Sequence, residues 1–160
     1  MNPRRYAVAV AVLLYLAASL QQSMADRLSI FEARPDFLLA VLAPAGLFVS
    51  RVGGAGLGLI CGVLHGAVAG ANLTAYAVSR TLGGFFVAWS RDLRFEPNTM
   101  ILFTTAAVLT VFSQLVLMFL AAPRDLAGFL GGTILSAVYN GVLAIPVYAL
   151  LKRLVRSTYR

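Results

Sequence analysis

The stretch of sequence that decides the fold runs from residue 53 to residue 70 and reads GGAGLGLICGVLHGAVAG. It carries no charge, and glycine recurs at every fourth position: Gly54, Gly58, Gly62, Gly66 and Gly70. An uncharged apolar stretch of about 18 residues or more is long enough to cross a bilayer as a helix. A row of glycines lets a second helix approach closely, because no Cβ atom separates the two backbones. We therefore expect a membrane helix whose packing is decided by glycine.

This glycine row has two interpretations. Residues four apart drift by about 40° on a helix, so five of them wind around roughly 160° of its surface. The row can serve one steeply crossing helix or two neighbours in turn. Those neighbours are either other helices of the same chain or the transmembrane helix of a partner protein. We predict that the row lets helices pack closely and that part of it receives the transmembrane helix of a partner protein.

The composition of the whole chain agrees with a membrane protein. Of 160 residues, 60% are hydrophobic and 12% are charged, against roughly 45–50% and about 25% in soluble domains. A soluble globular enzyme and a disordered chain are both excluded. The net charge of +7 comes from basic residues placed between and after the apolar runs. Membrane topology explains that placement better than nucleic-acid binding does.

Charge-free runs on either side of the glycine stretch predict an all-α integral membrane protein. We expect a six-transmembrane-helix bundle that forms a single membrane domain over residues 1–160. The predicted spans are about 6–24, 36–51, 53–70, 73–90, 98–122 and 126–151. A turn near residues 70–74 divides the third span from the fourth. The second span is short and contains Pro44, so a re-entrant segment is an alternative for it.

The distribution of Lys and Arg predicts that both termini are cytoplasmic. With the N-terminus inside, the outer segments hold only Arg27, Arg34 and Arg124. The inner segments then hold nine basic residues: Arg4, Arg5, Arg51, Arg91, Arg94, Lys152, Arg153, Arg156 and Arg160. The basic tail either lies against anionic membrane lipids or is a plain stop-transfer sequence. A cleaved signal peptide over the first span is the alternative topology.

Polar residues inside the predicted spans are the candidate functional residues. Arg80 lies about 10 Å deep in the fourth span, at 1.5 Å per residue, where a charge is costly and usually paired. Asp36, at the outer start of the second span, is its candidate partner; otherwise Arg80 extends outward or meets an acid on another protein. His65 is either a proton relay or a neutral, hydrogen-bonded core residue. The other polar residues bond helices together or line a shallow cavity: Gln21, Ser113, Gln114, Tyr139 and Asn140.

The sequence gives little support to catalysis. No pair of carboxylates lies within a span, and the chain has a single histidine, His65, and a single cysteine, Cys61. No orienting acid accompanies a Ser/His or Cys/His arrangement, and no phosphate-binding loop is present. We therefore predict a protein that is not an enzyme and that holds no cofactor and no metal.

Several short segments together resemble the MreD family of rod shape-determining membrane proteins in bacterial cell-wall elongation. In chain order they are Leu20-Gln21, Arg34-Pro35-Asp36 with the apolar residues after it, residues 56–65, Gly70, Leu73, Gly84, and Tyr139-Asn140-Gly141 with Pro146. Their order and spacing cover nearly the whole chain. The chain departs from the family pattern at His65, where an acid is common, at Thr74, where a glycine is usual, and at Arg80.

This resemblance implies a non-enzymatic subunit of the elongation machinery in the bacterial inner membrane. It implies MreC as a direct partner, and MreB filaments, RodA and its penicillin-binding transpeptidase as members of the same complex. It also implies an architecture similar to the S-components of ECF vitamin transporters. A vitamin-binding S-component is the alternative function, for which Ala7 and Ala11 have the A-x-x-x-A spacing of a docking motif.

Overall fold

The structure, a computed structural model, describes residues 3–30, 33–70, 72–93 and 98–156. The described residues form α1 (Pro3–Met24), α2 (Phe37–Gly46), α3 (Arg51–Ala69), α4 (Leu73–Ser90), the short 3-10 helix η1 (Arg91–Leu93), α5 (Thr99–Leu120) and α6 (Leu126–Arg156). The predicted all-α class is confirmed. Ala71 in the predicted turn, and Arg94 and Arg160 among the predicted inner charges, lie outside the described residues.

Short polar side chains fix where several helices begin. Asp36, Ser50 and Asn98 precede α2, α3 and α5, and each accepts a hydrogen bond from a backbone N–H three residues further on. Such caps satisfy backbone donors that the first turn leaves free. At the other end of α3, Gly70 has a φ of +66° and its N–H bonds to the Gly66 carbonyl 3.0 Å away. A left-handed conformation of this kind favours glycine and ends the helix.

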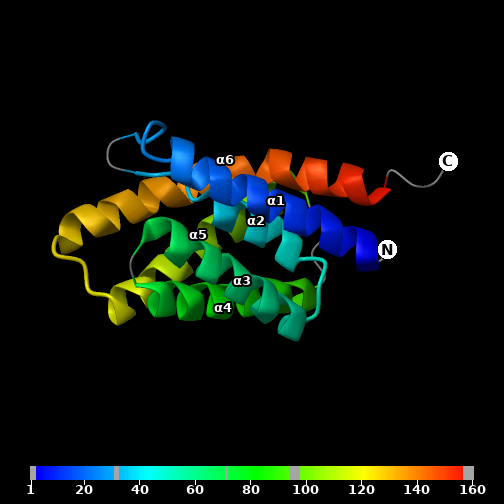
Figure 1. The fold of residues 1–160 in the computed structure, drawn as a ribbon, viewed down its shortest axis with the longest axis horizontal. Coiled ribbons are helices and arrows are strands. Elements are labelled where there is room, and N and C mark those ends of the chain that lie inside the picture. Colours follow the sequence, from blue (N-terminus) through cyan, green and yellow to red (C-terminus); the bar gives the residue numbers. More distant parts are fainter. Residues whose placement is uncertain (1–2, 31–32, 71, 94–97, 157–160) are drawn as a thin grey trace.

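Five longer helices surround the short helix α2. Contacts run from α1 to α3, α4, α5, α6 and back to α1, while α2 contacts each of these five helices. Figure 1 shows α1 and α6 along one side of the molecule, the α3–α4 pair along the other, and α2 between them. The hydrophobic core therefore centres on α2, whose residues from Leu38 to Gly46 are all buried.

The predicted second span, 36–51, is longer than the helix found there. α2 has ten residues, about 15 Å of helix, roughly half of a 30 Å hydrocarbon core. Because protein rather than lipid surrounds α2, its length is not set by the bilayer, and extended backbone can adjoin it. Gln21 bonds to Pro35 before α2, and Tyr6 bonds to Ala45 within it. The segment therefore runs antiparallel to α1 from Gln21 to Tyr6. A re-entrant loop would instead return to the side on which it starts.

Four of the described helices are long and apolar enough to cross a membrane: α1, α3, α5 and α6. The chain is therefore multi-pass. The last helix continues to Arg156, beyond the predicted end at 151. α4 has 18 residues and includes Arg80, which lowers its hydropathy, but that side chain faces the interior and is fully buried.

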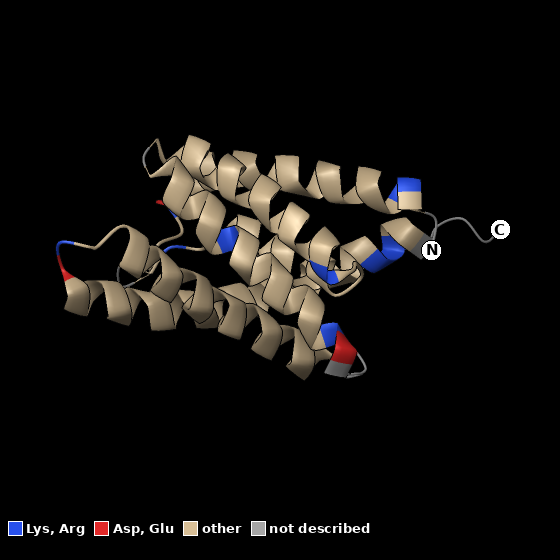
Figure 2. Cartoon of the chain, turned by 90° about the horizontal axis from the view of Figure 1, so that it is seen from below, with Lys and Arg blue, Asp and Glu red and all other residues tan. Residues whose placement is uncertain are grey.

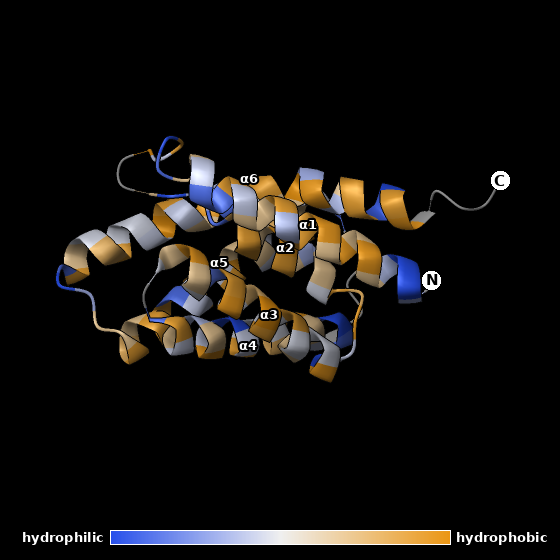
Figure 3. Cartoon of the chain, viewed as in Figure 1, coloured by the Kyte–Doolittle hydropathy of each residue, from blue (hydrophilic) through white to orange (hydrophobic). Residues whose placement is uncertain are grey.

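Most charged residues gather at the two ends of the bundle (Figure 2), and hydrophobic residues cover most of its length (Figure 3). The N-terminal end of α1 and the C-terminal end of α6 lie at the same end of the molecule (Figure 1), which we call the termini end. The start of α3 and the end of α4 meet where Arg51 pairs with Asp92, with Arg51 Nε 2.9 Å from Asp92 Oδ2. This arrangement agrees with the predicted grouping of inner basic residues; the cytoplasmic position of that end stays a prediction.

Candidate functional site

A buried ion pair lies at the start of α2. Arg80 on α4 donates from Nη2 to Asp36 Oδ2 over 2.9 Å, and the two residues are 0% and 5% exposed. The structure thus gives Arg80 the partner that the sequence suggested. Outward extension of Arg80, and its use for an acid on another protein, are both wrong for this arrangement.

The rest of the Arg80 guanidinium is held by α4 and α5. Its Nη1 donates to Ser79 Oγ over 3.1 Å, and the Ser79 hydroxyl donates to the backbone carbonyl of Ser113 on α5. The Tyr76 ring lies 5.4 Å from Arg80 Cζ, within the range of a cation–π contact. Arg80 is therefore fixed in place by polar and aromatic neighbours as well as by Asp36.

His65 on α3 lies beside the same carboxylate. Its Nδ1 is 3.4 Å from Asp36 Oδ2, and its ring stacks on Tyr76 with centroids 4.4 Å apart. Among the described residues, Nδ1 has no hydrogen-bond partner. His65 thus lies beside Asp36, a neighbour that nothing near it in the sequence indicates. Its role as a proton relay or as a neutral core residue stays a prediction.

Asp36 is also tied to α5 and α6 through its backbone. Its N–H donates to Asn140 Oδ1 over 2.8 Å, and Asn140 Nδ2 donates to Thr110 Oγ1 over 3.1 Å. Its other carboxylate oxygen caps α2 by accepting from the Leu39 N–H at 2.9 Å. A single aspartate therefore joins the start of α2 to four other helices.

The extended residues before α2 are held in the same way. Gln21 on α1 donates to the Pro35 carbonyl at 3.2 Å and accepts from the Phe37 N–H at 2.8 Å, as a neighbouring strand would. Ser136 on α6 donates to the Arg34 carbonyl at 3.0 Å. Backbone that is not helical survives in a membrane protein only when its polar groups are paired in this manner. The Arg34 side chain points elsewhere and pairs with Asp26 at the surface, 3.0 Å away.

These contacts place one polar side chain from every helix around the start of α2. We call this set the polar junction: Gln21 (α1), Asp36 (before α2), His65 (α3), Arg80 (α4), Thr110 (α5) and Asn140 (α6). Five of the six residues are candidates from the sequence, and the structure brings them together. Thr110, together with Ser79 and Ser136, was not singled out, because hydroxyl residues are common in membrane helices and nothing in their spacing marks them.

The glycine row packs against one helix of the same chain. A Cβ atom at Gly54 or Gly58 would overlap the carbonyl oxygens of Gly84 or Arg80 on α4. At Gly62 and Gly66 it would lie 2.6 Å from the Ala77 Cα and 2.7 Å from the Leu73 Cα. The prediction of close helix packing is confirmed. The prediction that part of the row receives the helix of a partner is wrong for these glycines, because α4 already covers them, and Gly70 serves as the helix end.

The remaining candidates lie outside the polar junction. A Cβ atom at Gly141 would lie 2.7 Å from the Phe103 ring, so this glycine allows α5 and α6 to approach. Pro146 lies inside α6. The hydroxyl of Ser113 and the Oε1 of Gln114 are buried without a hydrogen-bond partner among the described residues.

The contacts of the polar junction attach the helices of the bundle to one another. Its carboxylate and guanidinium pair with each other, and its amides bond to backbone groups and to Thr110, which offsets the cost of burying them. In the described part of the chain, no group of three or more His, Cys, Asp or Glu side chains is placed to hold a metal ion.

The polar junction lies within the region that resembles a known family. Comparison with curated proteins and with solved structures gave no match, so the likeness to ECF S-components stays a prediction. The family model described as rod shape-determining protein MreD matches residues 4–154, which include every member of the polar junction. The chain therefore belongs to the MreD family of rod shape-determining proteins and is a multi-pass protein of the bacterial inner membrane.

Proposed function

We propose that this chain is a non-enzymatic scaffold subunit of the rod-shape complex. In this proposal it binds MreC directly and, through the complex with MreB, RodA and the penicillin-binding transpeptidase, supports peptidoglycan synthesis and cell shape. The role in rod shape is inferred from membership of the MreD family. The observation that supports a scaffold is the polar junction, in which Gln21, Arg80 and Asn140 bond to the start of α2, Thr110 bonds to Asn140, and His65 lies beside Asp36.

A scaffold needs a fixed shape and an outer surface that others can bind. Most polar groups of the buried charges and amides bond within the chain, and such bonds favour a single arrangement of the helices. The outer surface is apolar, with Val8 on α1, Val52 on α3 and Phe119 on α5 each more than 60% exposed. Helix faces of this kind meet lipid or the transmembrane helix of another protein.

The test is recovery of MreC with the tagged chain from native membranes in mild detergent, followed by reconstitution of the two purified proteins. We expect MreC with the wild-type chain and with Arg34→Gln, which removes only the surface pair with Asp26. Asp36→Leu removes the centre of the polar junction and should reduce MreC recovery at equal amounts of bait.

Three results would contradict the proposal. One is failure of the purified pair to associate although MreC is recovered from membranes, since binding would then be indirect. Another is recovery of no MreC at all. The third is recovery of an ATPase pair with a membrane coupling subunit, which would identify a vitamin-transporter component.

A further inference from the structure

Two cavities lie between α4 and α5 toward the termini end, and they form one groove. Their volumes are about 300 and 320 Å³, and both are lined by Ser90, Thr104 and Thr105. We call this hollow the α4–α5 groove. It lies away from the polar junction and involves none of its residues.

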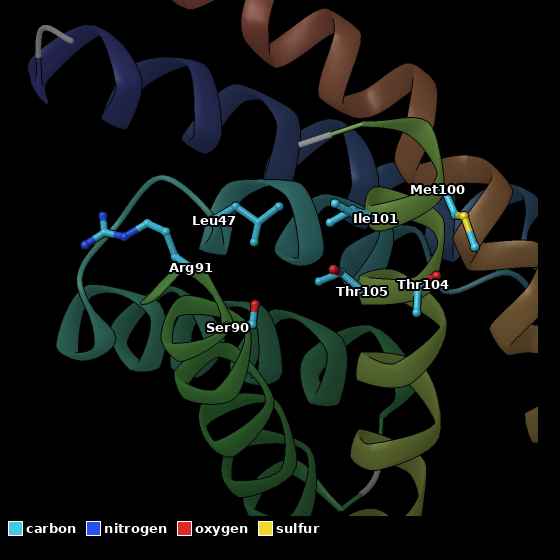
Figure 4. Close-up of a pocket in the computed structure, with 7 residues that line it drawn as sticks. All are labelled: Leu47, Ser90, Arg91, Met100, Ile101, Thr104 and Thr105. Atoms are coloured by element: carbon cyan, nitrogen blue, oxygen red, sulfur yellow. The ribbon is translucent and has the colours of Figure 1, made fainter. Parts of the chain in front are cut away.

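The mouth of the groove carries hydroxyl groups and one arginine among the apolar side chains of Leu47, Met100 and Ile101. Figure 4 shows Ser90 on α4 and Thr105 on α5 on facing sides of the cavity, with Thr104 beside Thr105 and Arg91 at the rim. Ser90 donates to the Val87 carbonyl, whereas the hydroxyls of Thr104 and Thr105 have no hydrogen-bond partner among the described residues. Two hydroxyl donors are therefore available to a ligand at this level.

The mouth also carries a positive charge. Arg91 is exposed and forms no ion pair with the residues that the structure describes, and its guanidinium extends from the rim away from the cavity (Figure 4). The neighbouring acid, Asp92, is already paired with Arg51. An anion at the rim would thus meet Arg91 without competition from Asp92.

Deeper along the helices, the lining becomes apolar. There the lining includes Phe86, Val108 and Phe112, and Gly83 lets α4 pack closely against Leu109 on α5. On α5 its lining extends from Met100 to Phe112, a rise of about 18 Å at 1.5 Å per residue. Half of a hydrocarbon core of about 30 Å is about 15 Å. The groove therefore runs from one membrane surface to about the midplane.

We propose that the α4–α5 groove binds one anionic phospholipid from the leaflet at the termini end. Its phosphate lies at the rim beside the threonine hydroxyls, where the exposed Arg91 side chain has to turn toward the cavity to reach it. An acyl chain lies against Phe86, Val108 and Phe112. The charge at the mouth, the apolar depth and the one-leaflet length each match this ligand. A transmembrane helix of a partner requires a groove along the full thickness of the membrane. The proposal does not depend on the proposed binding of MreC.

The test is native mass spectrometry of the purified chain in detergent micelles containing either phosphatidylglycerol or phosphatidylcholine. We expect one retained phosphatidylglycerol per wild-type chain and weaker retention of phosphatidylcholine. Arg91→Gln should lower the preference for phosphatidylglycerol about fivefold, because a surface cation contributes about 1 kcal/mol toward an anionic lipid. The matched control is Arg153→Gln, which removes an exposed charge at the same end but outside the groove and should leave the preference unchanged.

A second pair of variants tests the apolar part. Val108→Trp fills the groove and should reduce retention of both lipids, while Val142→Trp adds the same bulk to an exposed position on α6 outside it and should not. If a groove variant and its control changed lipid retention equally, the proposal would be wrong, because the lipid would then bind without preference for the groove. A photoreactive residue at position 108 that crosslinks to a polypeptide in native membranes, and not to lipid, would also overturn it.

Discussion

At the scale of single residues, the ion pair of Arg80 and Asp36 is the costliest feature of the molecule. Both side chains are almost completely enclosed, and burying an isolated charge is far more expensive than burying an apolar group. The pair is tolerated because each partner also bonds to other groups, Arg80 to Ser79 and Asp36 to the start of α2. Removing Arg80 leaves the buried Asp36 carboxylate with only the His65 imidazole beside it.

This arrangement predicts a strong dependence of stability on Arg80. Arg80→Met should lower the free energy of unfolding by about 3–5 kcal/mol, the usual cost of breaking a buried pair. Adding Asp36→Asn removes the orphaned charge and keeps an amide oxygen that can cap α2, so at least half of the loss should return. Reversible unfolding in mixed micelles measures both changes. A double variant no more stable than Arg80→Met alone would contradict this account.

Arg34 provides the matched control for the loss of an arginine. Its pair with Asp26 is 68% and 79% exposed at the two side chains, and exposed pairs contribute about 0–1 kcal/mol. Arg34→Met should therefore change the free energy of unfolding by less than about 1 kcal/mol under the same conditions.

Sequence reasoning identified most of the polar junction but not its geometry. Arg80 and Asp36 were paired because a buried charge needs a partner and only one acid lies at a suitable depth. The approach of His65 to Asp36 could not be predicted, since it depends on how α3 and the start of α2 pack, and the two residues are far apart in the chain. Thr110 was missed because a single hydroxyl on an apolar helix has no distinguishing pattern.

At the scale of helices, the α3–α4 pair is the closest contact in the bundle. The Gly54 and Gly84 backbones meet without side chains between them, and Gly58 lies against the Arg80 carbonyl. The glycine row therefore also sets the position of Arg80. Close packing along α3 and charge pairing at Asp36 are parts of one arrangement.

A prediction about Gly58 follows, and the chain supplies its own control. Gly58→Ala forces a Cβ atom into the Arg80 backbone and should lower the free energy of unfolding by about 1–3 kcal/mol, a typical cost of overpacking. Gly56→Ala lies on the same helix with no atom within 4 Å of the added Cβ, and it should cause no loss. Parallel unfolding curves decide the question, and equal losses for the two variants would refute the packing argument.

The number and order of the helices followed from charge-free runs, but the length of α2 did not. Hydropathy marks the residues that avoid water, and both lipid and protein interior satisfy that condition. Residues 47–50 are apolar enough to extend the predicted span, yet the chain turns there so that Ser50 can cap α3. Gly46 lies where an added Cβ would be 2.7 Å from Val87 on α4, so neighbouring helices determine where α2 ends.

At the scale of the whole molecule, the basic residues predict the orientation in the membrane. Single cysteines at the two ends of α5 test it in a Cys61→Ala background, which removes the one native thiol, itself fully buried. Thr99→Cys at the termini end should resist a membrane-impermeant maleimide until cells are permeabilised. Ala122→Cys at the opposite end should react in spheroplasts with intact inner membranes. The reverse pattern would place both termini outside.

The central position of α2 has a consequence for how the protein is made. Asp36 leaves the ribosome 104 residues before Asn140, whose side-chain oxygen accepts a hydrogen bond from the Asp36 N–H. Until α6 is synthesised, a ten-residue helix with a charged start has no complete set of partners, and lipid alone does not supply them. The translocon or an insertase must therefore shelter this segment while the later helices emerge. Arrival of α6 closes the bundle, because Asn140 and Ser136 then bond to the backbone of the segment before α2.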